Sequence, residues 1–266
     1  MKINIKIQIT LLLIFVQLLG CSNKNIIEPK HFDKTDISYK NAVIDSMIAE
    51  KDEISNRLID INEKNNSTYW KEINGHKYVL TVTWTKDINN YRKNKTIKTF
   101  WGDTWVTIVP EIQNWFNNNY KNGKLSLRTE QLLGLPENRG YSHFVELWVR
   151  PENLFRPSPD NEIWDKSAQL KFPENAEKSY INWFNGKIIL SYYSTKQYPW
   201  TRLGYTYDWN PTTSEIGLSE FVIKKDSLVI VNSMQSTNDY LIKKKIKWNF
   251  TGRTSKGYSL PSETPE

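Results

Sequence analysis

Charged and aromatic side chains gather in two short stretches of this chain, and the first lies between residues 146 and 160. The apolar run His143 to Val149 is followed by Arg150 and Arg156 among three prolines. Proline fixes its backbone dihedral, so this loop should hold polar groups rigidly at the end of a strand, where binding sites often lie. Trp148 and Arg156 are therefore candidate binding residues. The alternative is an arginine–carboxylate network that only braces the loop.

The second stretch lies between residues 198 and 221 and is richer in aromatic side chains. Aromatic faces stack on sugars, nucleobases and planar cations, while arginine and aspartate orient a ligand. The candidate binding residues here are Trp200, Arg202, Tyr205, Tyr207, Asp208 and Trp209. The alternative is an aromatic layer of the core, because aromatic residues make up 13% of the whole chain.

Three positions resemble the site of ADP-ribosyltransferase toxins: Arg150 at a strand end, Ser194-Thr195 after a helix, and Ser219-Glu220 before a hairpin. The resemblance implies a transferase that uses NAD, with Arg150 on the cofactor's phosphates and Glu220 on the oxocarbenium-like transition state. Ser194 would belong to the Ser-Thr-Ser element. The chain departs from that pattern at Leu218, where the family has a Glu, and it lacks the final Ser.

A glycan-directed hydrolase is a second enzymatic reading. Its carboxyl pair would be Glu146 and Glu220, which must lie about 5–9.5 Å apart to cleave a glycosidic bond. The sequence has no phosphate-binding glycine loop, no Gly-x-Ser-x-Gly elbow and no His-Glu-x-x-His motif. We therefore expect no metal and no cofactor, NAD under the transferase reading excepted.

The first twenty-one residues suggest where the protein resides. A basic start with Lys2 and Lys6 precedes a short apolar stretch, which is typical of a secretory signal peptide. The stretch ends in Leu18-Leu19-Gly20-Cys21, which resembles a bacterial lipoprotein lipobox. This resemblance implies cleavage before Cys21, acylation of that residue with long chains such as palmitate, and stable attachment to a membrane. Ser22 after the cysteine resembles the outer-membrane default of enteric bacteria.

Composition limits the remaining classes. The chain has 266 residues, a formal net charge of +7 and a single Cys, so a disulfide framework and a cysteine-based zinc site are excluded. A mean hydropathy of -0.62 excludes a polytopic membrane protein. The basic clusters at residues 92–98 and 243–247 favour a solvated face or anionic headgroups, and nucleic acid is not an expected partner.

The elements that must position these residues follow from periodicity and turn signals. We expect a signal peptide at 1–20, a tether at 21–40, an amphipathic helix or stalk at 41–64, a globular domain at 65–252 and a frayed tail at 253–266. Within the domain, the pattern predicts a hairpin at 70–84, strands at 103–109 and 143–149, a second hairpin whose strands are 221–223 and 228–231, and a strand at Tyr205 and Tyr207. Helices are predicted at 110–115, 125–133 and 174–192. The fold class is α+β, with an antiparallel or mixed sheet and helices on one side.

The leading interpretation is a lipid-anchored envelope protein whose aromatic domain binds a glycan, another ligand or an envelope protein. The alternatives are an extracytoplasmic enzyme, and a structural lipoprotein whose 41–64 helix is a partner surface. Convergence of Arg150, Arg156, Arg202, Asp208 and Glu220 in one pocket would favour a ligand or catalysis, and dispersal would favour a scaffold.

Overall fold

The computed structural model describes residues 34–242, and those from Ser38 onward form one compact unit. The expected signal peptide, the lipidation site Cys21, the basic cluster at 243–247 and the tail lie outside the described residues. The helices are α2 (Lys34–Asp45), α3 (Glu111–Asn119), α4 (Leu125–Leu132), α5 (Lys178–Tyr192) and α6 (Thr237–Ile242). The strands are β1 (Trp70–Ile73), β2 (His76–Thr85), β3 (Thr96–Lys98), β4 (Thr104–Ile108), β5 (His143–Val149), β6 (Leu154–Phe155), β7 (Tyr205–Tyr207), β8 (Ile216–Ser219), β9 (Phe221–Ile223) and β10 (Leu228–Ser236).

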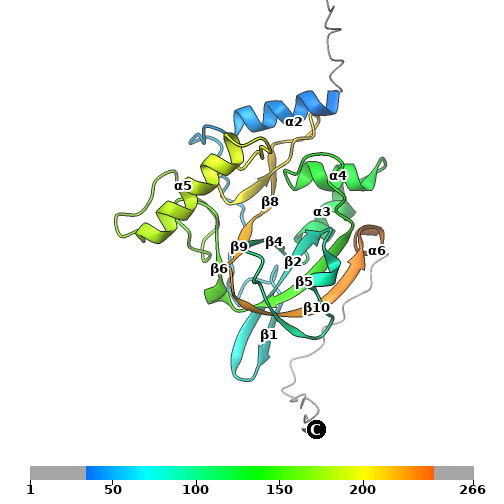
Figure 1. Ribbon diagram of the computed structural model, residues 1–266, viewed down its shortest axis with the longest axis vertical. Coiled ribbons are helices and arrows are strands. Elements are labelled where there is room, and N and C mark those ends of the chain that lie inside the picture. Colours follow the sequence, from blue (N-terminus) through cyan, green and yellow to red (C-terminus); the bar gives the residue numbers. More distant parts are fainter. Residues whose placement is uncertain (1–33, 243–266) are drawn as a thin grey trace, which may run out of the picture. The chain divides into compact units, whose positions relative to one another are not determined.

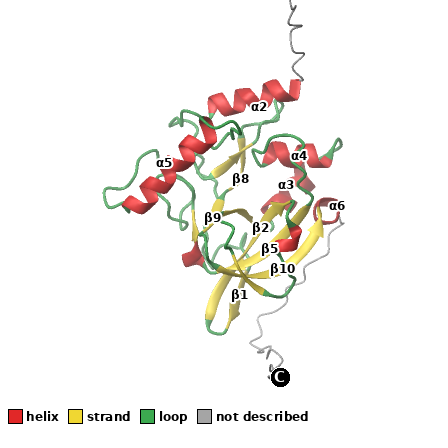
Figure 2. Cartoon of the chain, in the orientation of Figure 1, coloured by secondary structure: helices red, strands yellow, loops and turns green. Residues whose placement is uncertain are grey.

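The fold is α+β, as the sequence predicts (Figures 1 and 2). Eight strands form one sheet in the order β3-β10-β5-β2-β4-β9-β6, with β1 paired to β2, while β7 and β8 form a separate pair. All of these pairings are antiparallel. Strand β9 pairs with β4 and β6, whereas β10 pairs with β3 and β5, so the hairpin predicted at 221–231 is wrong: its two strands lie apart in the sheet. The β1–β2 hairpin closes at Asn74-Gly75, where both residues have positive φ angles of 52° and 73°. This tight turn is the one that an Asn-Gly pair favours.

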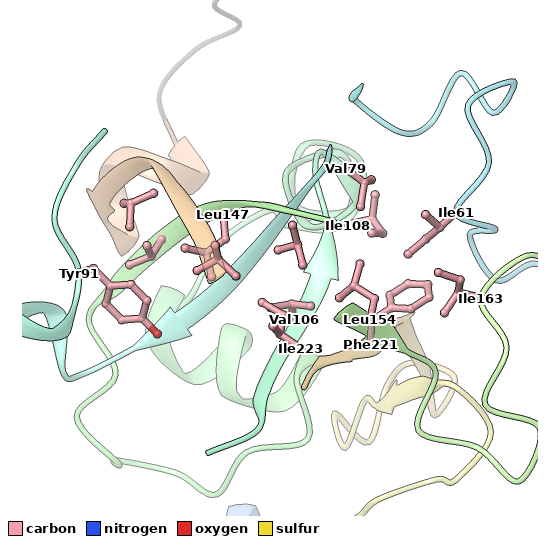
Figure 3. Packing of buried hydrophobic residues seen from close by; sticks show 14 residues of the cluster. Ile61, Val79, Tyr91, Val106, Ile108, Leu147, Leu154, Ile163, Phe221 and Ile223 are labelled. Atoms are coloured by element: carbon pink, nitrogen blue, oxygen red, sulfur yellow. The ribbon is translucent and has the colours of Figure 1, made fainter. Parts of the chain in front are cut away.

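One face of the sheet carries a loop-covered core, shown in Figure 3. Its members alternate along each strand, because successive side chains of a strand point to opposite faces. On β5, for example, Val145, Leu147 and Val149 are all fully buried in this core. Ile61 and Ile163 close it from two loops that are joined by a 2.8 Å bond from the Ile61 amide to the Ile163 carbonyl.

The opposite face carries a helix-covered core. It contains Leu80, Val82 and Trp84 from β2, together with residues of α3, α4 and α6. Trp105 of β4 also lies on this face, since the neighbouring Val106 belongs to the loop-covered core. The α5 residue Trp183 stacks on Trp105, with ring centroids 6.3 Å apart. Helices α3, α4, α5 and α6 therefore cover one side of the sheet, as predicted.

The expected helix at residues 41–64 is wrong. Helix α2 ends at Asp45, and the following chain is turns and irregular structure. The apolar residues read as one helical stripe separate into different clusters: Leu58 packs with Leu203 and Tyr205, whereas Ile61 enters the loop-covered core. The amides of Leu58 and Ile61 bond to the carbonyls of Lys166 and Ile163. The backbone here bonds to distant loops instead of forming helical hydrogen bonds. Tertiary contacts thus override the helical spacing of the apolar residues in 41–64.

Candidate functional site

A cavity of about 820 Å³ lies on the helix-covered face of the sheet. Its floor includes Val82 and Trp84 of β2 and Trp105 and Thr107 of β4. Helix α5 borders one side, and residues 133–135, which follow α4, border another. In Figure 1, α5 lies on one side of β8 and β9, and α3 and α4 lie on the other. The cavity therefore occupies sheet surface between two groups of helices.

Strand register places Glu220 in this cavity. In β4 and β9, Trp105 pairs with Val222 and Val106 pairs with Phe221. Val106 and Phe221 point into the loop-covered core, so Glu220, one residue before Phe221, points to the other face with Trp105. Of these two neighbouring residues, Phe221 therefore enters the core and Glu220 lines the cavity.

Glu220 has no charge partner among residues 34–242. Its side chain is partly accessible, but Oε2 is buried and has no hydrogen-bond partner among residues 34–242. Burial alone raises the pKa of the Glu220 carboxyl to about 8, because a charged carboxylate is less stable where water is excluded. The group is therefore mostly protonated at neutral pH when the cavity is empty. The Nε1 of Trp200, which also lines the cavity, is a second buried polar atom without a partner in the described part of the chain.

Aromatic rings surround the cavity. Trp105 and Trp200 meet edge to face, with centroids 6.0 Å apart and planes at 86°. Trp84 and Tyr141 stack at 5.2 Å, and Tyr91 contacts Trp101 at 5.3 Å. The rings that remain partly accessible include Trp101, Trp105, Tyr141 and Tyr198. Such a lining can bind an apolar or planar ligand through stacking and area burial.

A charged pair stands in the same cavity. The Asp103 carboxylate accepts a 2.6 Å hydrogen bond from Trp183 Nε1 and pairs with the Lys187 ammonium at 3.3 Å. Lys187 also lies over the Trp183 ring at 5.5 Å. Because these charges compensate one another, Glu220 differs from Asp103 in having nothing to offset its negative form.

Five of the residues singled out in the sequence line the cavity: Ser194, Trp200, Tyr205, Tyr207 and Glu220. The two tyrosine hydroxyls are already used, because Tyr205 donates to the Glu53 carbonyl and Tyr207 to the Asp45 carboxylate. The Ser194 hydroxyl bonds to the carbonyls of Leu190 and Lys196. Among these five, Trp200 and Glu220 are the residues with buried polar atoms left without a partner in the described chain.

Arg156 is a structural residue, which corrects its assignment as a binding residue. It is fully buried and donates to the carbonyls of Glu162 and Asp165 at 3.2 and 2.7 Å. Its guanidinium also lies over the Phe221 ring at 5.3 Å. The proline-rich loop is thus braced by an arginine, as the structural alternative expects, but through backbone carbonyls more than through carboxylates: the Asp165 carboxylate lies 3.8 Å from the guanidinium.

Four other candidates also bond to neighbouring parts of the fold. Arg202 donates to the Ser46 carbonyl at 3.0 Å, and Asp208 accepts two hydrogen bonds from Arg128. The indole nitrogens of Trp209 and Trp148 donate to the Leu135 carbonyl and to Asn232. These side chains hold loops and strands together and none of them lines the 820 Å³ cavity, so a role for them in binding stays a prediction.

Neither expected catalytic set is assembled. Arg150 lies in a different cavity, of about 710 Å³, and pairs with Glu152. The transferase pattern therefore loses its cofactor-binding arginine. Glu146 is buried and accepts hydrogen bonds from Tyr240, Asn232 and Ser233, so its carboxylate is enclosed on another part of the sheet. Of the five groups whose convergence would favour a ligand, Glu220 alone lines the 820 Å³ cavity. The five groups are therefore dispersed, which is the outcome expected of a scaffold, and the case for a ligand depends instead on Glu220 together with the aromatic lining.

Several residues that line the cavity lie far apart along the chain and were not expected from the sequence. They include Trp84 of β2, Trp105 of β4, Asp103 before it, and Lys187 of α5. The sequence pattern that could have identified the two tryptophans is a large aromatic residue at an alternating strand position. The same pattern is equally expected of residues in the hydrophobic core. Only the helix arrangement leaves space above them.

The wider comparisons add no family. No protein-family model, curated protein or solved structure matches this chain. Within residues 34–242, no cluster of three or more His, Cys, Asp or Glu side chains could hold a metal. In the same range no helix has the length and apolarity needed to cross a bilayer.

Proposed function

We propose that this protein is a membrane-anchored lipoprotein, attached through Cys21, whose aromatic cavity binds a small organic ligand without catalysis. The observation that supports binding is the unpaired Glu220 carboxyl within an 820 Å³ cavity lined by aromatic rings. A buried polar group that makes no hydrogen bond is costly. A ligand that bonds to it would offset that cost, and the rings would supply the buried apolar area.

Ligand screening tests this proposal. Purified full-length protein in a non-ionic detergent is titrated with mono- and disaccharides, nucleosides, aromatic acids and organic cations. Tryptophan fluorescence and the Tm are followed, because Trp105 and Trp200 line the cavity. At least one class should quench the fluorescence and raise Tm. The same ligand should lose its effect in Ser191→Trp, which fills the cavity from α5.

Ser214→Trp is a matched control, because Ser214 is exposed in the loop before β8. It should bind the ligand as the natural protein does. If no class binds, or if Ser191→Trp binds as tightly as Ser214→Trp, the proposal is wrong.

A second candidate function is hydrolysis, and the protonation state of Glu220 favours it. A carboxyl group that keeps its proton near neutral pH is suited to act as a general acid. Asp103 lines the same cavity and would replace Glu146 as the second carboxylate. Release of reducing sugar from envelope glycans that is lost in Glu220→Gln would establish this activity; turnover retained in that variant would exclude it.

A further inference from the structure

We infer that the ligand of this cavity carries a compact organic cation, such as a quaternary ammonium or alkylammonium group, which pairs with Glu220 between the faces of Trp105 and neighbouring rings. This inference rests on the proposed ligand-binding function and names its ligand class. It is drawn from the charges and rings that line the cavity.

The charge balance of the cavity points to a cation. The Asp103 carboxylate is compensated by Lys187, and the Lys86, Asp87 and Lys196 side chains are exposed to solvent. Glu220 is the lining carboxyl group with a buried oxygen that has no partner among residues 34–242. One positive charge next to it would offset the cost of ionising the carboxyl group where water is excluded. An anionic ligand would instead require Glu220 to keep its proton.

The rings supply the second half of such a site. Trp105 lines the cavity together with Trp101 and Tyr141, and all three rings are partly accessible. Trp183, which is not among the lining residues, stacks on Trp105 with planes at 29° and covers one of its faces. The face of an aromatic ring is the negative side of its quadrupole, so the accessible parts of the lining rings can attract a cation. A carboxylate together with aromatic faces is the combination by which proteins recognise quaternary ammonium groups.

Other titratable groups near Glu220 must be considered in a pH experiment. Burial and a negative charge on Glu220 both raise the pKa of Tyr192 in α5. The Tyr192 hydroxyl donates to the Ser46 carbonyl, and the Arg202 guanidinium lies over its ring. The pKa of Tyr192 is raised to about 12, so this tyrosine stays neutral throughout the accessible range. The remaining ionisable groups that line the cavity are Lys86, Asp87, Tyr91, Asp103, Tyr141, Lys187, Lys196, Tyr198, Tyr205 and Tyr207.

The test uses permanently charged probes, whose own charge does not change with pH. Choline and benzyltrimethylammonium are titrated calorimetrically into the full-length protein at pH 6 and pH 9, alongside 3,3-dimethyl-1-butanol, the uncharged isostere of choline. Glu220 must ionise to pair with a cation, and it does so around pH 8 in the empty cavity. Below pH 8, the affinity for the cations should therefore rise about tenfold with each unit of increasing pH. The isostere should bind weakly at both pH values.

Variants locate the effect. Glu220→Gln should lose at least about tenfold in cation affinity at pH 9 and should lose the pH dependence. Glu72→Gln makes the same change on the exposed strand β1 and should behave as the natural protein. Phosphocholine distinguishes the source of the cation: tighter binding than choline assigns a headgroup-borne cation, and weaker binding assigns a free one.

Two results would overturn the inference while leaving the proposed function intact. One is equal binding of choline and its isostere at pH 9; the other is a ligand from the wider panel that binds in the cavity while both cations fail. Failure of the whole panel would instead remove the proposed function itself.

Discussion

At the scale of single residues, two buried groups illustrate opposite uses of charge. Arg156 donates to backbone carbonyls through Nε and Nη2, while the Glu220 carboxyl group is left without a partner in the described chain. The first stabilises a loop. The second lowers stability whenever it ionises, which is a cost that proteins accept mainly at functional sites.

The Glu220 carboxyl should make stability depend on pH. Its pKa is about 8 in the folded chain and 4.5 ordinarily, so between these values the folded state binds more protons than the unfolded state. The free energy of unfolding should therefore fall as pH rises from about 4.5 to 8 and level off above that. In Glu220→Gln the fall should be smaller by at least about 1 kcal/mol, or roughly 2–4 °C in Tm between pH 5 and pH 9.

Thermal unfolding at several pH values measures this difference. Glu111 is a second carboxyl whose pKa burial raises, to about 7, although two hydrogen bonds from Ser219 oppose the shift. It contributes the same background to both proteins. Parallel curves for the natural chain and Glu220→Gln would show that Glu220 ionises normally.

Arg156 and Arg150 should respond differently to the same substitution. Arg156→Met leaves several buried carbonyls without a donor, and we expect it to lower the free energy of unfolding by about 3 kcal/mol or more. Arg150→Met removes a partly exposed ion pair to Glu152 and should change it by less than about 1 kcal/mol. Urea denaturation of both variants provides the measurement, and equal losses would refute the structural role of Arg156.

At the scale of elements, the β7–β8 pair forms part of the cavity wall through close backbone packing. A Cβ on Gly217 of β8 would overlap Thr206 of β7 and approach the Leu132 carbonyl to 2.8 Å. The Thr206 hydroxyl itself bonds to the Leu132 carbonyl at 2.6 Å, which joins β7 to the end of α4. Glycine is therefore required here for space.

Two glycine-to-alanine variants test this packing. Gly217→Ala should lower the free energy of unfolding by about 2 kcal/mol or more, because backbone atoms must move apart. Gly186→Ala is the matched control, since Gly186 lies within α5 and a Cβ there meets nothing within 4 Å. It should raise the free energy of unfolding by roughly 0.5–1 kcal/mol through helix propensity. Similar destabilisation by both would mean that the β7–β8 contact is not tight.

At the scale of the whole molecule, the proposal joins a lipid anchor to a ligand-binding domain. Each buried CH₂ of an acyl chain contributes about 0.8 kcal/mol, so two or more chains hold the protein at a membrane. The domain would then sample ligands near that surface.

Substitution of Cys21 separates the anchor from the domain. Cys21→Ser should abolish labelling with palmitate and move the protein out of the membrane fraction, because no other cysteine is present to carry the lipid. Cavity binding and Tm should be unchanged, since residues 38–242 hold the cavity. Mass spectrometry of the natural product provides the direct check: a bare thiol at Cys21 would contradict the anchor.

The sequence by itself determined the local elements. Alternation predicted β2, an apolar run predicted β5, the Asn-Gly pair predicted the first hairpin, and four-residue spacing predicted α5. These signals are local, so they survive without knowledge of the fold. The same spacing failed at residues 41–64, where contacts with distant loops replaced a helix.

Only the tertiary structure decided which polar groups have hydrogen-bond partners within the fold and which are left to bind a ligand. Arg156, Asp208 and Glu220 look equally functional in the sequence, yet two have partners supplied by loops and by α4, and one has none in the described chain. Hydrogen-bond partners come from residues as many as 162 positions away, and no periodicity encodes them. The cavity likewise arises because α5 and the α3–α4 pair stand apart on one sheet face, which is a property of packing rather than of any segment.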